Sequence, residues 1–280
     1  MKISRRKIII TTTALGVANA YPNLVLSKEL LEKDTIEKSV GITTDLLVQY
    51  FIKTGFVAVP AAPMISGHAF NDGLNYDDYL TPSNRQEYLI QRASRIEDVA
   101  KKNQPGTLPL FTTLGYMQPK GGVNEHAKFV LDCLISRLHL DPKRMHITST
   151  ELIKSSLTIF KNYGIQESQI QLRSLAEAKK AGDGSGWFEP AGHHKQVSIP
   201  TYSIEYLMPD DKYLEIAEMG VDHLAGAFGI ERITMAKNQA YFSWGQYLLE
   251  FKNLIQAEAN KNNKALPVGY YEILGVSKPL

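Results

Sequence analysis

The stretch AGAFGIERITM, residues 225–235, places one arginine, Arg232, behind small residues and glycine in an otherwise apolar run. A guanidinium beside so much hydrophobic sequence needs a partner, because burying it unpaired costs several kcal/mol. The Gly-Ile-Glu-Arg segment predicts the start of a helix, where backbone N–H groups and the helix dipole favour an anion. Arg232 is therefore expected either to bind a phosphate of a ligand or to pair with Glu231 or another acid of the chain.

A second arginine, Arg95, lies upstream in SNRQEYLIQRASRIEDVAKK, residues 83–102, and is followed by Glu97. This segment supports two interpretations. Apolar residues at helical spacing favour an amphipathic helix on which Arg95 is merely solvated; they are Leu89, Ala93, Ile96 and Ala100. The alternative is a strand that presents an Arg-x-Glu pair ahead of a loop and Phe111.

The composition is that of an ordinary globular protein. The chain has 280 residues, 44% of them hydrophobic, which is enough for one sizeable domain or at most two. Its 31 basic and 29 acidic residues leave a net charge of +2, too small for a long polyanion to be the main partner. The single cysteine, Cys133, excludes an internal disulfide and a cysteine-based zinc site, and its apolar surroundings favour a packed thiol.

The first twenty residues, MKISRRKIIITTTALGVANA, differ from the rest of the chain. A twin arginine, an apolar run and a small-residue cleavage site predict a twin-arginine export signal over residues 1–20, and hence a periplasmic protein. The alternative is a frayed basic N-terminus and a cytoplasmic protein. Residues 21–40 are expected to be a linker and 41–280 the folded domain; no other segment has the roughly 18 apolar residues of a membrane span.

The body of the chain predicts an α+β domain, because helices at its ends flank strands that do not alternate regularly with helices. The adjacent His193 and His194 are interpreted as loop residues rather than as a pair of metal ligands, because the side chains of neighbours on an extended chain point in different directions. The expected elements are a helix at 41–54, a strand at 55–65 broken by Pro60 and Pro63, a helix at 124–140 with Asn124 as its cap, a strand at 144–150, a helix at 151–164 closed by Gly164, a glycine-rich loop at 181–194, antiparallel strands at 196–208 and 211–219, and a long helix starting near Asn238.

Three of these segments together resemble the catalytic domain of class II aminoacyl-tRNA synthetases, which is an antiparallel sheet flanked by helices. They are GFVAVPAAP at 55–63, RIE at 95–97 followed by Phe111, and GIER at 229–232. Within that class the sequence is most similar to alanyl-tRNA synthetase, over roughly residues 42–236. The additional similar segments, in the family's order, are LFTTLGYM, RLHLDPKRMHITSTE, SGWFEPAG, TYSIEY and KYLEIAEMGVDH.

The resemblance implies ATP-dependent activation of a small amino acid as its aminoacyl-adenylate. Charge grows on the α-phosphate as the amino acid's carboxylate attacks it, and a bidentate arginine suits that oxygen. Arg95 and Arg232 are the implied catalytic residues, with Arg95 on the α-phosphate and Arg232 on the γ-phosphate. The remaining implied roles are ATP binding by Glu97, Phe111 and Gly229, Mg²⁺ binding through ATP by Glu205 and Glu215, and amino-acid binding by Trp187, Asp222 and Glu218.

The sequence also departs from the family pattern. Thr107 replaces an expected basic residue, Ala225 and Ala227 replace glycines, and Glu218 replaces an asparagine in the implied amino-acid pocket. The sequence ends at residue 280 without the family's tRNA-recognising and editing regions. Transfer to a carrier protein or a small-molecule acceptor is therefore expected rather than to tRNA, and a homodimer is among the assemblies that the resemblance allows. The alternative is a non-catalytic paralogue that acts as a ligand-binding or regulatory module.

Overall fold

The computed structural model describes residues 33–62, 64, 86–95, 98, 101, 104–117, 121–188, 199–221, 225–242, 252–258 and 260. All of them belong to one compact unit, residues 32–280. The expected export signal lies outside the described residues. Of the expected linker only residues 33–40 are described, and they form the beginning of a helix.

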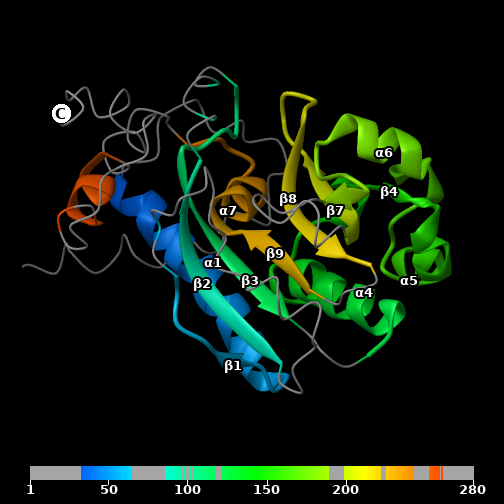
Figure 1. Ribbon diagram of the computed structural model, residues 1–280, viewed down its shortest axis with the longest axis horizontal. Helices are drawn as coiled ribbons and strands as arrows, with labels where there is room; N and C mark the ends of the chain where they lie inside the picture. The colour runs from blue at the N-terminus through cyan, green and yellow to red at the C-terminus, as the bar shows by residue number, and fades with distance from the viewer. Residues whose placement is uncertain are drawn as a thin grey trace, which may run out of the picture. The chain divides into compact units, whose positions relative to one another are not determined.

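A mixed sheet forms the centre of this unit, with its strands in the order β1-β2-β3-β9-β8-β7-β4-β5 (Figure 1). Neighbours from β2 to β4 are antiparallel, whereas β1 and β5 pair in parallel at the two ends. The short β6 pairs with β7 only. The strands are β1 (Val57–Ala58), β2 (Glu87–Ser94), β3 (Leu110–Met117), β4 (Met145–Thr150), β5 (Ile170–Arg173), β6 (Trp187–Phe188), β7 (Ile199–Leu207), β8 (Tyr213–Gly220) and β9 (Ala225–Gly229).

Helices flank this sheet, so the expected α+β class is confirmed. The α7 helix lies against its middle strands β3, β9 and β8, and α6 lies beside β4 (Figure 1). Among the described helices, none is long and apolar enough to cross a membrane. The helices are α1 (Lys33–Lys53), α4 (Val123–Leu131), the π-helix η1 (Asp132–Arg137), α5 (Leu157–Asn162), α6 (Leu175–Ala181), α7 (Ile230–Asn238) and the short 3₁₀ helices η2 (Pro142–Arg144), η3 (Glu151–Ser156) and η4 (Glu167–Gln169).

One face of the sheet packs against α1, α4 and α7 and forms an aromatic core. Phe51 of α1 lies with its ring centroid 5.2 Å from that of Tyr116 on β3 and 6.2 Å from that of Phe228 on β9. On the same face, buried Glu231 of α7 accepts hydrogen bonds from the backbone N–H (2.7 Å) and the hydroxyl (2.9 Å) of Thr112. Side chains alternate along a strand, so the residues that alternate with Tyr116 and Thr112 on β3 and with Phe228 on β9 point to the opposite face of the sheet. We call this opposite face the distal face.

The strand register aligns residues of the distal face in rows across the sheet. One row runs from Gly115 through Ala227, Glu218 and Ser203 to Thr148, crossing β3, β9, β8, β7 and β4. It therefore changes from small apolar residues on β3 and β9 to polar residues on the other three strands.

A β-bulge in β8 places two glutamates on the distal face. Ile204 pairs with Ala217 but Glu205 pairs with Glu215, so Ile216 is an extra residue in β8. Glu215 and Glu218 are three residues apart and would face opposite sides of a regular strand. The inserted residue shifts the alternation, and both carboxylates reach the distal face.

Three sequence predictions are corrected by these elements. Residues 87–94 form strand β2, so the helical interpretation of this part of the Arg95 segment is wrong, because pairing with β3 overrides the local apolar spacing. The N-terminal cap of α4 is Gly122 and not Asn124. The Gly122 N–H donates to the Glu125 carboxylate, whereas the Asn124 side chain accepts a hydrogen bond from the Ser156 hydroxyl. Among the described residues 238–242, no helix starts near Asn238.

The segment around Asn238 is the end of a helix. Gln239 adopts a left-handed conformation with φ 53° and terminates α7, and the described residues 240–242 are not helical. Helix reappears at residues 252–258. The first expected helix, 41–54, is the second half of α1, and the antiparallel pair expected at 196–208 and 211–219 is confirmed as β7 and β8.

Candidate active site

The candidate active site lies where β9 ends on the distal face. This strand stops at Gly229, where α7 begins, and Arg232 is in the first turn of that helix. Gly229 is close to Ile216 of β8: a Cβ built on Gly229 would lie 3.6 Å from the Ile216 carbonyl oxygen. The end of β9 therefore lies beside β8, and Arg232 of α7 contacts Glu215 of β8 there.

Arg232 contacts the backbone and one carboxylate of this region. Its Nε donates to the Gly106 carbonyl at 3.2 Å, and its Nη1 lies 3.4 Å from both the backbone oxygen and Oε2 of Glu215. The ion pair is partly solvent-exposed, with 29% of the arginine side chain and 35% of the glutamate side chain accessible. Within the described part of the chain Nη2 has no hydrogen-bond partner, so the guanidinium keeps donors for a ligand.

Arg95 comes directly after β2, which ends at the same edge of the sheet as β9, where Arg232 lies. Its backbone N–H donates to the Pro109 carbonyl at 2.9 Å and extends the pairing with β3. Half of its side chain is exposed, and within the described part of the chain it forms one ion pair, a long one of 3.9 Å to Asp98. Burial raises the pKa of Glu215 and of Glu218; the Arg95 charge opposes this effect at both, and Arg232 opposes it at Glu215, so the two arginines share one carboxylate.

Four acidic side chains, Glu205, Glu215, Glu218 and Asp183, share this part of the distal face, and the pKa values of Glu215 and Glu218 reflect burial more than attraction to the arginines. Burial raises the pKa of Glu215; Arg232 opposes this effect, while Glu205 and Asp183 add to it. Burial also raises the pKa of Glu218 well above its usual value, with a further contribution from Glu215. Crowded carboxyl groups of this kind favour binding of a cation or retention of a proton.

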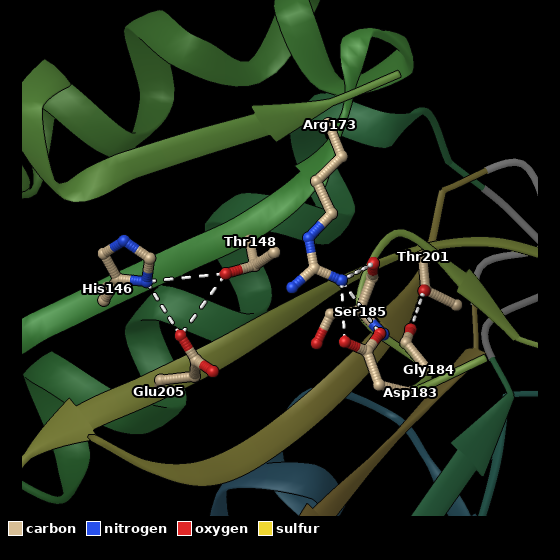
Figure 2. A network of polar contacts seen from close by, with 8 residues as sticks. All are labelled: His146, Thr148, Arg173, Asp183, Gly184, Ser185, Thr201 and Glu205. Atoms are coloured by element: carbon tan, nitrogen blue, oxygen red, sulfur yellow. Dashed lines mark hydrogen bonds and ion pairs between the residues drawn. The ribbon is translucent and has the colours of Figure 1, made fainter. Parts of the chain in front are cut away.

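Glu205 is also tied to β4. Its Oε2 is 2.7 Å from His146 Nδ1 and accepts a hydrogen bond from Thr148 at 3.3 Å (Figure 2). The two side chains are 18% exposed for His146 and 24% for Glu205. These contacts fix Glu205 opposite Glu215 and leave Oε1 of Glu205 for another ligand.

Several buried oxygens of the distal face have no hydrogen-bond partner among the described residues. Native proteins leave few such atoms unpaired, because each costs about 1–3 kcal/mol. The distal face therefore has hydrogen-bonding capacity that the described residues leave unused. The atoms are Thr113 Oγ1, Thr150 Oγ1, Ser203 Oγ and Glu218 Oε1.

A short loop, residues 182–186, is fixed next to these atoms. Arg173 of β5 donates from Nη1 to both carboxylate oxygens of Asp183, at 2.9 and 2.8 Å, and lies 3.3 Å from the Ser185 carbonyl oxygen (Figure 2). From β7, the Thr201 hydroxyl donates to the Gly184 carbonyl at 2.6 Å. The loop is thus bonded to two strands and forms a fixed boundary of the site.

The structure brings together five of the residues singled out from the sequence, and it adds others that the sequence did not indicate. Phe111 is half-buried on the distal face beside Arg95, and Trp187 is half-buried under the Lys179 ammonium, 4.0 Å from the ring centroid. Glu97 and Asp222 lie outside the described residues. The five residues are Arg95, Arg232, Glu205, Glu215 and Glu218; the sequence did not indicate His146, Thr148, Arg173, Asp183 and Ser203.

A metal ion has no complete set of protein ligands in the described part of the chain. No group of three or more His, Cys, Asp or Glu side chains there is arranged to hold one. Glu205 and Glu215, directly opposite each other on β7 and β8, supply two carboxylates, and a hard cation would need further oxygens from a bound ligand.

Comparisons with known proteins give a distant structural likeness. No protein-family model matches the sequence, and no curated protein matches it. The fold is similar to asparaginyl-tRNA synthetase from Entamoeba histolytica in complex with asparaginyl-adenylate, with a TM-score of 0.41, 13% identity, and coverage of 72% of this chain and 63% of that chain. For asparaginyl-tRNA synthetase from Pyrococcus horikoshii, complexed with asparaginyl-adenylate, the TM-score is 0.37 and the identity 10%, with coverage of 72% and 64%.

The chain thus spans less than two thirds of the length of these synthetases. A likeness of this size assigns neither a family nor a substrate to this chain, so its function has to be inferred from the geometry of the site.

Proposed function

We propose that this chain is a class II synthetase-like domain that activates a small amino acid with ATP. In this reaction a carboxylate oxygen of the amino acid attacks the α-phosphorus, the bond from that phosphorus to the bridging oxygen of pyrophosphate breaks, and an aminoacyl-adenylate forms. Charge develops on the phosphate oxygens, and positioned arginines stabilise it.

The convergence of Arg95 and Arg232 on Glu215 is the observation that carries this proposal. The two arginines are far apart in sequence and come from different elements, β2 and α7, yet both act electrostatically on the same carboxylate. Arg232 retains Nη2 for a ligand, and Arg95 is half exposed. A triphosphate bound across the end of β9 would therefore meet both guanidinium groups.

The resident carboxylates fit the proposed Mg²⁺. Glu205 and Glu215 are hard oxygen donors on adjacent strands, and Mg²⁺ is usually bound by one or two carboxylates together with substrate phosphates. The ion would neutralise charge on the phosphates of ATP. Phe111, half-buried next to Arg95 on the distal face, is the proposed surface for the adenine ring.

The acceptor of the acyl group is proposed to be a carrier protein or a small molecule rather than tRNA. The net charge of +2 supports this, because sequence-independent RNA binding depends on many phosphate contacts by basic residues. The proposal extends to export through residues 1–20, which N-terminal sequencing of the protein from its host would test by finding or not finding cleavage after Ala20.

Amino-acid-dependent exchange of labelled pyrophosphate into ATP tests the activation step. We expect exchange with at least one small amino acid, and loss of it when Mg²⁺ is chelated. An absence of exchange with all proteinogenic amino acids and with 2,3-diaminopropionate, measured on protein that binds ATP with the stoichiometry of one site, would reject activation while leaving nucleotide binding intact.

A non-catalytic ligand-binding module is the second candidate. The observation that favours it is the internal pairing of Arg232 with Glu215 and the Gly106 carbonyl, which partly satisfies the guanidinium without a phosphate. Such a module would bind a ligand on the distal face without pyrophosphate exchange. Calorimetric titration with ATP and with amino acids, run beside the exchange assay, distinguishes the two candidates.

A further inference from the structure

The distal face carries an unpaired acceptor group next to the proposed amino-acid site. Ser203 of β7 and Glu218 of β8 are directly opposite each other in the strand register. The Ser203 Oγ and Glu218 Oε1 are both buried and lack a hydrogen-bond partner among the described residues, and the Ser203 side chain is fully buried. Two neighbouring strands therefore present unsatisfied oxygens side by side.

A third such oxygen belongs to Thr150 on β4, which is 1% exposed and has an unpaired Oγ1. Thr150 is two residues beyond Thr148, so alternation places it on the distal face. These three oxygens, from Thr150, Ser203 and Glu218, are called the acceptor group below. A hydroxyl can rotate to donate or accept. A donor or cation placed beside Glu218 would favour its ionised form, which only accepts, so the group as a whole suits a ligand that donates hydrogen bonds.

The loop 182–186 limits the space beside the acceptor group. A Cβ added to Gly184 would lie 2.9 Å from Glu218 Oε1, so the loop backbone passes directly against that carboxylate. A Cβ added to Gly186 would lie 3.1 Å from the Thr150 methyl group. Because Arg173 and Thr201 hold the loop in place, a long side chain placed beside these oxygens would collide with the loop backbone.

We propose that the amino acid activated by this chain has a short side chain that donates hydrogen bonds, a hydroxyl or an ammonium group recognised by Glu218, rather than an alkyl side chain such as that of alanine. This inference rests on the proposed function and specifies its substrate class. The physical reason is that these oxygens are already buried without a hydrogen-bond partner among the described residues: a donor on the substrate would satisfy them, whereas an alkyl group would leave that cost in place.

Three amino acids of nearly equal size test the proposal. 2-Aminobutyrate, serine and 2,3-diaminopropionate differ only in ending the side chain with a methyl, hydroxyl or ammonium group. We expect kcat/KM for pyrophosphate exchange to be at least about 100-fold higher with serine or 2,3-diaminopropionate than with 2-aminobutyrate. Preference for serine would identify a hydroxyl as the recognised group, and preference for 2,3-diaminopropionate an ammonium.

Variants of Glu218 separate these two chemistries. Glu218→Gln preserves size but removes the charge, so it should lower activity with 2,3-diaminopropionate about 100-fold and with serine less than about 10-fold. Glu218→Leu removes the polar group and should abolish the preference for either donor. Glu167→Gln, on an exposed residue of η4, is the matched control and should change nothing.

The outcomes that overturn the proposal are specific to it. Equal activation of all three amino acids would mean that Glu218 binds the α-ammonium group common to them all, and preference for 2-aminobutyrate would contradict the proposal directly. If no amino acid supports exchange, the proposed function fails separately, and calorimetric binding of the same three amino acids tests the inference: tighter binding of a donor upholds it, and equal binding overturns it. Ser203→Ala, which removes one oxygen of the group without adding volume, replaces any Glu218 variant that does not fold.

Discussion

Arg232 Nη1 and Glu215 Oε2 are 3.4 Å apart on the distal face and join the first turn of α7 to strand β8. The pair holds the guanidinium at the end of β9 while Nη2 points to no described protein partner. A partly exposed ion pair of this kind contributes little to stability, about 0–1 kcal/mol. The pair therefore serves to position the arginine for an anion more than to stabilise the fold.

Replacing Arg232 should therefore impair catalysis much more than folding. We expect Arg232→Ala to lower kcat/KM for pyrophosphate exchange by about 100-fold to 1,000-fold, and Arg232→Lys to restore little, because an ammonium lacks the planar fork of donors. Arg137→Ala, on the surface of η1, is the control. A loss in the two Arg232 variants that matched a loss of folded protein by circular dichroism would contradict this assignment.

Loosening the loop 182–186 should affect the amino acid and spare ATP. Arg173→Ala removes both bonds to Asp183 and the contact with the Ser185 carbonyl. We expect the KM for the amino acid to rise about 10-fold, because a mobile wall positions the substrate less well, while the KM for ATP stays within about twofold. Lys161→Ala, which breaks the exposed pair with Glu167, should leave both constants unchanged. Equal increases in both would show that the loop has no separate role.

Two glycines should respond in opposite directions to the same substitution. A Cβ on Gly226 would clash with the Met219 sulfur and lie 3.1 Å from the Tyr116 hydroxyl. Gly226→Ala should therefore destabilise the fold by about 1–3 kcal/mol. Gly41 lies in α1 with nothing within 4 Å of an added Cβ, so Gly41→Ala should stabilise it by about 0.5–1 kcal/mol. Denaturant unfolding measures both, and a loss of stability in Gly41→Ala would show an unrecognised constraint on α1.

The fully buried His126 should make the folded state sensitive to acid. Burial lowers the pKa of His126 from 6.5 to about 4, and its Nε2 lies 2.5 Å from the Tyr116 hydroxyl. Between these two pKa values the unfolded chain binds a proton that the folded chain does not. The contribution of neutral His126 to the free energy of unfolding is therefore fully present above pH 6.5 and falls as the pH is lowered toward 4. The contribution lost between pH 7 and pH 5 is about 2 kcal/mol.

Buried Glu231 changes stability with pH in the opposite direction, so the effect of His126 has to be measured as the difference between the natural sequence and a variant that lacks the histidine. Burial raises the pKa of Glu231 from 4.5 to about 6, which makes its contribution to stability fall as the pH rises through this range. Subtracting the pH profile of His126→Gln from that of the natural sequence removes this shared contribution and leaves the histidine's. The exposed His139→Gln is the control. Parallel profiles for the natural sequence and His126→Gln would contradict a neutral buried imidazole.

The sequence predicted β4, β7 and β8 well because their patterns are local. β7 and β8 alternate polar and apolar residues, and β4 is bounded by a turn at Pro142. β2 illustrates the opposite case. Its apolar residues are spaced as in a helix, and only pairing with β3 along its whole length makes it a strand, which is a long-range interaction that local spacing does not contain.

The candidate site could likewise be predicted only in part: the sequence indicated single residues but not their partners. Arg232 at a helix start follows from the Gly-Ile-Glu-Arg segment, but its partner Glu215 follows from the end of β9 beside β8, which depends on the assembled sheet. Arg173 and Asp183 are separated by α6, and no spacing rule links them. Their meeting is a consequence of the path of the chain between β5 and the loop.

The extra residue at Ile216 has a consequence for comparing this chain with its distant relatives. The two halves of β8 are out of phase by one position, so an alignment that runs through the strand without a gap assigns one of the two glutamates to the wrong side of the sheet. Homologues that lack the insertion would turn one carboxylate into the hydrophobic interior, and they would be expected to carry an apolar residue there. The count of residues between these two positions, more than their identity, is thus the feature by which proteins with the same chemistry can be recognised.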